Sequence, residues 1–426
     1  MKISTTFIPV FLFILLLFSG VTWSLVDSQQ MVDTGGAAAI NVFNGKAGLI
    51  AGLVLVSLYL AYLRHPIRAM GAPLALFCVL AAASAAWASN PGTTLFALAN
   101  LLLLLATVII AHKLLGFTKM VRLVWLLSTV MILISVALAL IGDRHALMGG
   151  LHSGRWRGIF AHKNAFGQFL AVNVLISAFG RPSLKFSGLT VYSVVLIDVV
   201  ALVMANSATA DIGVAAGVTG GIALLPIPNR ALRNLWRYGA IAVACLLGAV
   251  LLLQPEIVNN AVGRDPTMSS RGDLWQAAMP TTFQRTLGSG YGTGGGSQVS
   301  IELQKRMNRT TALSVQSGFI NTALELGWIA VLFYVVWAGA AVVSALLDRN
   351  AAPTQTLLIA LLALHMIESV SEVNGCFAAS WLLLVVMVPM VEVRLAGTPR
   401  FGLTRRRYTS IAPANARPAP SAELPA

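Results

Sequence analysis

Apolar runs of about 18–25 residues recur along this chain, and they constrain its fold more than any other feature. A run of that length lets an α-helix cross a hydrocarbon core of roughly 30 Å. The chain is 57% hydrophobic and only 10% charged, whereas soluble globular proteins carry roughly 25% charged residues. The runs lack the alternation of barrel strands, and an open sheet would leave unpaired backbone groups in lipid. The sequence therefore predicts an all-α, polytopic integral membrane protein.

We expect about twelve transmembrane helices, with ends defined to about four residues. They cover residues 7–26, 46–63, 71–88, 94–112, 121–141, 164–180, 189–206, 212–228, 238–254, 318–346, 354–371 and 376–393. Residues 1–396 would form one membrane domain, followed by an Ala- and Pro-rich, disordered tail over 397–426. We interpret the first run as a retained helix, because no small-residue cleavage site follows it directly; a cleaved signal peptide is the alternative.

The distribution of Lys and Arg predicts that both termini are cytoplasmic. With the N-terminus inside, the short cytoplasmic loops each hold basic residues, as the positive-inside rule requires. These residues are Arg64, Arg68, Lys113, Lys119, Arg122, Arg181, Lys185, Arg230, Arg233 and Arg237. The even number of helices returns the C-terminus, with its arginines, to the same side.

Two predicted external loops break this charge pattern. The basic loop, residues 142–163, and the large periplasmic loop, residues 255–317, both carry several Arg and Lys residues. Long loops translocate regardless of charge, which accounts for the second loop but not for the short first one. The net charge of +14 accompanies no nucleic-acid motif, so we expect no nucleic-acid partner and assign the excess to membrane topology and an anionic ligand.

The densest polar cluster lies where the basic loop meets the helix predicted from residue 164. Arg155, Arg157, His162, Lys163 and Asn164 lie within ten residues beside a helix N-terminus. Guanidinium groups bind phosphate in a bidentate manner, and helix N-termini favour anions. The cluster therefore predicts an anion site, with anchoring of Arg and Trp at the membrane interface as the alternative.

This segment, Gly-Arg-Trp-Arg-Gly-Ile-Phe-Ala-His-Lys-Asn-Ala-Phe-Gly over residues 154–167, resembles the O-antigen ligase/polymerase family of bacterial membrane glycosyltransferases, and its exopolysaccharide polymerase branch most. Other parts match in the same order, over roughly residues 70–395. They are Trp87-Ala88-Ser89-Asn90-Pro91, Ser270-Arg271-Gly272-Asp273-Leu274-Trp275, Gly288-Ser289-Gly290-Tyr291-Gly292, Gln316-Ser317-Gly318-Phe319 and Leu324-Glu325-Leu326-Gly327-Trp328.

The resemblance implies a bacterial inner-membrane enzyme that polymerises oligosaccharide repeat units carried on polyprenyl diphosphate, on the periplasmic face. Its expected partners are the lipid-linked glycan donor, a glycan acceptor, the lipid bilayer and other components of polysaccharide secretion. A ligase that passes a finished glycan to another acceptor is the close alternative. A transporter or flippase, and a non-catalytic component of a secretion complex, are further alternatives from other classes.

The chemistry assigns roles to particular residues. The leaving diphosphate needs cations, and the candidates for binding the diphosphate or the sugar are Arg155, Arg157, Lys163, Asn164, Arg271 and Ser317. The acceptor hydroxyl needs a proton acceptor, and the candidate catalytic residues are His162, Gln316, Asp273 and Glu325. We expect no metal and no cofactor, because arginines supply the charge and the sequence has no clustered Asp/His set.

Two positions depart from the family pattern. The family often has His-Asn at Gln316-Ser317, and that His is the proposed base of the ligases, whereas a Gln side chain accepts no proton at neutral pH. The family also often has Ser-Arg at Ser207-Ala208. Asp198, within a predicted span, and the group of His365, Glu368 and Glu372 remain polar residues without an assigned role; the latter would line a sugar cavity or face water.

Overall fold

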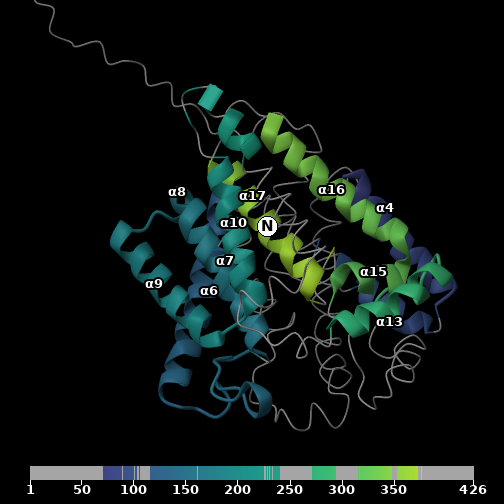
Figure 1. Cartoon of the computed structure of the whole chain (residues 1–426), viewed down its shortest axis with the longest axis horizontal. Helices are drawn as coiled ribbons and strands as arrows, with labels where there is room; N and C mark the ends of the chain where they lie inside the picture. The colour runs from purple at the N-terminus through teal and green to yellow at the C-terminus, as the bar shows by residue number, and fades with distance from the viewer. Residues whose placement is uncertain are drawn as a thin grey trace, which may run out of the picture.

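The computed structural model describes a helical protein (Figure 1). It describes residues 71–88, 90–99, 101–102, 105, 116–160, 162–224, 227, 229, 231–232, 234–239, 271–293, 315, 317–347, 353–372 and 376. Within these ranges the backbone forms no sheet, and an isolated antiparallel bridge joins Leu147 to Trp156. The predicted spans 7–26, 46–63, 238–254 and 376–393, and the tail after residue 396, lie outside the described ranges except for residues 238, 239 and 376, so the total of about twelve helices stays a prediction.

Within the described part, four helices are long and apolar enough to cross a membrane. They are α6 (Phe117–Leu140), α9 (Gly188–Ala205), α16 (Trp328–Leu347) and α17 (Pro353–Ser371). The shorter helices α4 (Ala72–Ala83), α7 (Lys163–Phe179) and α10 (Ala208–Ala223) complete the packed group. On α9, Leu189, Leu196 and Val203 are exposed; such an apolar outer surface is what a lipid-facing helix needs.

One predicted helix, 318–346, is two helices in the structure. α15 (Gly318–Leu326) ends at Gly327, and α16 begins at Trp328. Gly327 has φ +79°, and a Cβ there would lie 1.9 Å from the carbonyl oxygen of Thr286. Only glycine fits this positive φ and close approach, so the tertiary contact with residue 286 breaks a segment whose apolar pattern is continuous.

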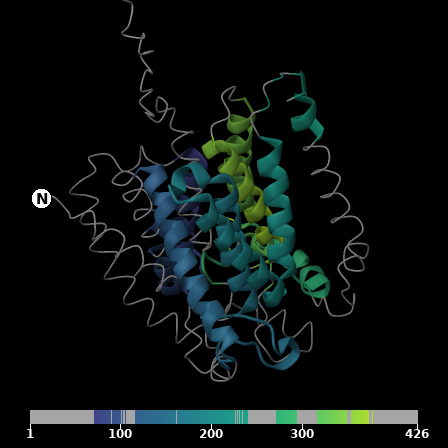
Figure 2. The same ribbon diagram turned by 90° about the vertical axis from the view of Figure 1, so that its left-hand side faces the viewer.

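The helices that matter most for the site pack around α17. α10 packs along α17 and α7, and α7 also packs against α6 and α9 (Figure 2, with α10 in teal and α17 in yellow-green). Gly213, Gly217 and Gly221 lie on α10 at the contact, close to side chains of α17 or α7. Small residues at such positions let membrane helices approach closely.

This contact predicts opposite results for two glycines of α10. A Cβ at Gly217 would lie 2.5 Å from Leu175 Cδ1 and 2.9 Å from the carbonyl oxygen of Ala360, whereas one at Gly220 would meet nothing closer than 3.3 Å. We expect Gly217→Ala to destabilise the purified protein by about 1–3 kcal/mol through overpacking. Gly220→Ala should leave stability equal or higher, because Ala favours helix by about 1 kcal/mol. Thermal unfolding in detergent measures both, and equal melting temperatures would contradict the described packing.

The segment predicted as the large periplasmic loop contains a helix, α13 (Arg271–Gln284). It packs on α15, where Ala278, Val315, Ile320 and Leu324 form a small apolar cluster. The Trp275 indole N–H donates to the Val315 carbonyl at 2.9 Å. The start of α13 is therefore held close to the N-terminal end of α15.

Candidate functional site

The basic loop has a defined conformation and packs against the ends of several helices. The Trp156 N–H donates to the Met204 carbonyl at the end of α9, at 3.2 Å. The Ile159 N–H donates to Ser135 Oγ on α6, also at 3.2 Å. Trp156, Ile159 and Phe160 are buried. The loop thus has one defined position over the ends of α6, α7 and α9.

Two cations of the loop are buried within this fold. Arg157, 7% exposed, donates from Nε to the His145 carbonyl at 2.9 Å, and Lys163, 3% exposed, donates from Nζ to the Asn206 carbonyl at 2.6 Å. Asn206 is the C-cap of α9, where a cation is favoured by the helix dipole. Burial lowers the pKa of Arg157 from its ordinary value, yet a guanidinium stays charged at neutral pH. Contact of either cation with a diphosphate stays a prediction.

Three side chains of the loop are partly exposed and lie together. Arg155 Nη1 donates to His152 Nδ1 at 3.2 Å, and the rings of His152 and His162 meet edge to face at 5.9 Å. His162 is the N-cap of α7, and its Nδ1 accepts the Asn164 N–H at 3.2 Å. A neutral imidazole that accepts at Nδ1 carries its proton on Nε2. His162 is therefore arranged to donate a hydrogen bond to an anion rather than to accept a proton from a hydroxyl.

Asn164 connects this cluster to α17. Its Nδ2 donates to Glu372 Oε1 at 2.9 Å, and its Oδ1 accepts from Ser207 Oγ at 3.3 Å. Thr209 Oγ1 donates to the same Glu372 oxygen at 3.2 Å. The polar junction, Asn164, Ser207, Thr209 and Glu372, thus joins the N-terminal ends of α7 and α10 to the C-terminal end of α17. The sequence shows Glu372 as a polar residue at the end of an apolar run, but it does not predict the contact with Asn164, because the two residues are 208 positions apart.

The other described site candidates lie around α15. Glu325 accepts the Gly292 N–H at Oε2, at 2.9 Å, and the Asn321 side-chain N–H at Oε1, at 3.2 Å. Ser317 is the N-cap of α15 and accepts the Ile320 N–H at 3.5 Å. In this structure, the Glu325 carboxylate orients the Gly-rich turn at 288–292, and Ser317 caps a helix.

Three segments that carried the family resemblance meet at this Gly-rich turn. The Trp87 indole N–H donates to the Leu287 carbonyl at 3.1 Å, and the Ser289 N–H donates to the Leu324 carbonyl at 2.9 Å. A Cβ at Gly290 would lie 2.5 Å from Ala88 Cβ. The motifs at 87–91, 288–292 and 324–328 are therefore one packed unit rather than independent features.

The remaining predicted residues are only partly accounted for. Arg271 and Asp273 lie in the first turn of α13, and the structure describes their backbone alone. Gln316 lies outside the described residues. Among the described residues, no group of three or more His, Cys, Asp or Glu side chains is arranged to hold a metal ion.

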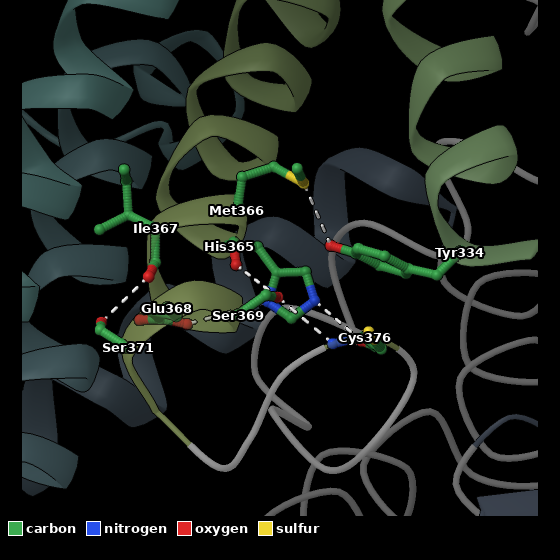
Figure 3. A network of polar contacts seen from close by, with 8 residues as sticks. All are labelled: Tyr334, His365, Met366, Ile367, Glu368, Ser369, Ser371 and Cys376. Atoms are coloured by element: carbon green, nitrogen blue, oxygen red, sulfur yellow. Dashed lines mark hydrogen bonds and ion pairs between the residues drawn. The ribbon is translucent and has the colours of Figure 1, made fainter. Parts of the chain in front are cut away.

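Residues at and just after the C-terminal end of α17 contact both groups of candidate residues, and Figure 3 shows the polar contacts among His365, Ser369 and Cys376 there. His365 Nε2 donates to the Cys376 carbonyl at 3.0 Å, and the Cys376 N–H donates to Ser369 Oγ at 3.3 Å. Cys376 Sγ lies 3.9 Å from the Gly318 carbonyl, at the start of α15. Glu372, on the same helix end, meets Asn164. α17 therefore lies between the basic loop and the start of α15.

His365 and Glu368 do not face water, contrary to one sequence-based alternative. Their side chains are 1% and 0% exposed, and His365 Nδ1 lies 3.9 Å from Glu368 Oε2. Glu372 is partly exposed. Of His365, Glu368 and Glu372, Glu372 alone is both partly exposed and bonded to a candidate site residue.

Comparison with known proteins gives one match. The sequence profile of the family described as O-Antigen ligase matches residues 193–335, which include most of α9, all of α10, α13 and α15, and the start of α16. The segment 154–167 lies outside the match. No curated protein and no solved structure matches the chain. The matched segment supports a relationship to the O-antigen ligase family over residues 193–335, and the described part of the chain contains helices long and apolar enough to span a membrane.

Proposed function

We propose that this chain is a glycosyltransferase of the bacterial inner membrane that polymerises polyprenyl-diphosphate-linked repeat units on the periplasmic face. The observation that carries the proposal is the basic loop, which holds Arg155 and His162 at the N-terminus of α7 and two buried cations, Arg157 and Lys163. The family match supports glycan transfer from a lipid carrier. In this arrangement both termini are cytoplasmic and residues 255–317 are periplasmic.

The reaction joins an acceptor hydroxyl to the anomeric carbon of the donor sugar while the lipid diphosphate leaves. Negative charge grows on the diphosphate as the glycosidic bond breaks. Donors fixed in place before the reaction stabilise such charge most, because they need no reorganisation. Arg155, His162 and the first turn of α7 supply those donors, and Arg271 on α13 is a further candidate. The proposal requires no metal and no cofactor.

A ligase remains the second candidate, and the family's description as O-Antigen ligase favours it. Both enzymes share the donor and the leaving group and differ in the acceptor. Cells that lack this protein should accumulate single lipid-linked repeat units if it polymerises them. They should accumulate long lipid-linked chains if it is a ligase. Extraction of lipid-linked glycans and separation by size distinguish the two, and an unchanged lipid-linked pool would contradict both.

A further inference from the structure

The proposed reaction needs a proton acceptor, which three of the four first candidates do not supply; for the fourth, Asp273, the structure describes the backbone alone. Gln316 is not titratable, and Glu325 binds the Gly-rich turn. His162 accepts the Asn164 N–H at Nδ1, which leaves a proton on Nε2 in its neutral form. The inference below rests on the proposed function and concerns which other group at this site removes the proton.

Glu372 is a described carboxylate bonded to Asn164, the residue that directly follows the basic loop. Asn164, the residue bonded to Glu372 Oε1, also donates its backbone N–H to His162. Asn164 thus connects the carboxylate to His162 of the donor cluster. It is partly exposed, whereas its neighbour Glu368 is fully buried.

The surroundings of Glu372 favour an anionic oxygen at this place. Asn164 and Thr209 each occupy the second position of a helix, α7 and α10, and both donate to Oε1. Helix N-termini carry partial positive charge that attracts a carboxylate. Glu372 directly follows Ser371, the last residue of α17, where the helix dipole is unfavourable to a negative charge. Such a local conflict, offset only by tertiary contacts, is typical of functional positions.

We infer that Glu372 is the catalytic base of the transfer reaction. The proton of the acceptor hydroxyl moves to the Glu372 carboxylate, while the hydroxyl oxygen forms a bond to the anomeric carbon. The bond between that carbon and the diphosphate oxygen breaks, and the polyprenyl diphosphate leaves with the electron pair. Glu372 then releases its proton to solvent. One bond forms for each that breaks, and no further reactant is consumed.

Glu372→Gln separates this role from a structural one. The Gln side-chain oxygen can still accept from Asn164 and Thr209, so the polar junction is kept while the proton acceptor is lost. Initial rates are measured with the full-length protein in lipid nanodiscs, on lipid-linked repeat units extracted from cells lacking it. General-base catalysis contributes about 10²–10⁴-fold, so kcat should fall by that factor with KM for the donor unchanged.

Asp211→Asn is the matched control, since Asp211 is an exposed carboxylate in the first turn of α10 and should leave the rate within a few fold. A Glu372→Gln rate close to that of the wild type, or higher, would overturn the inference. A loss of rate in Asp211→Asn but not in Glu372→Gln would also overturn the inference. If Glu372→Gln also lowers the melting temperature, Glu372→Ala with added formate decides. Restored rate supports the base, and no restoration contradicts it.

Failure of the proposed function gives a different result from failure of this inference. If the wild-type protein transfers no glycan from these donors, the proposed function falls and the base falls with it. If the wild type transfers glycan and Glu372→Gln does so equally well, only the assignment of Glu372 is wrong.

Discussion

Replacing Arg155 and Arg157 together by Ala should reduce the glycan product to background. The two arginines contribute in different ways. Arg155 is partly exposed and bonded to His152, so its loss should weaken donor binding and leave the fold intact. A hydrogen bond to a charged group contributes about 1.5–3 kcal/mol, which corresponds to roughly 10- to 100-fold in rate. Arg157 is buried and bonded to the His145 carbonyl, so its loss should also lower the melting temperature.

Conservative and matched variants make this result specific. Arg155→Lys should recover only part of the rate, because a lysine keeps the charge but loses the planar fork that binds phosphate in a bidentate manner. Arg144→Ala changes an exposed arginine of the same loop and should leave product yield within a few fold. Product yield is measured in membranes with equal amounts of inserted protein. A double variant with wild-type yield would exclude the loop as the donor site.

Gly158→Ala should lower product yield nearly as much as the double replacement of Arg155 and Arg157, although it changes no polar group. Gly158 has φ +58°, and a Cβ there would lie 2.1 Å from Ser135 Cβ and 2.4 Å from Ser135 Oγ. The left-handed backbone costs an L-residue about 1–2 kcal/mol, and the contact with α6 must open as well. That opening would break the bond from the Ile159 N–H to Ser135 Oγ and displace the arginines beside it.

Gly154→Ala is the control within the same loop. Gly154 also has a positive φ, +79°, but a Cβ there would meet nothing within 4 Å. It should cost only the backbone strain, so melting temperature and yield should fall much less than in Gly158→Ala. Equal losses in the two variants would show that backbone strain alone, and not the seating of the loop on α6, controls activity.

Several features of this protein are determined by short stretches of sequence. Continuous apolar runs predict α6, α7, α9 and α17 to within about four residues, because a spanning helix must satisfy its backbone internally and cover it with apolar side chains. The cation cluster of the basic loop is predicted for a similar reason, since its members lie within ten residues at one helix N-terminus. The family match over residues 193–335 agrees with the resemblance carried by the motifs in that part of the chain.

Contacts between distant residues decided the rest. The apolar pattern is continuous through Gly327, yet the Thr286 carbonyl divides the segment into α15 and α16. Glu325 is a catalytic candidate by motif, but its oxygens bind Gly292 and Asn321. Hydropathy and spacing carry no information on such pairs, because they describe each helix alone.

The role of Glu372 depends most clearly on contacts that sequence patterns do not predict. Within its own segment it is a carboxylate at the C-terminal end of α17, where the helix dipole disfavours a negative charge, and the sequence assigns it no role. Only the packing of α10 and α7 against α17 brings Asn164 and Thr209 to its Oε1. Glycines on α10 allow that close packing. The sequence by itself thus determines which segments are helices and where the cations lie, whereas helix packing decides which carboxylate meets them.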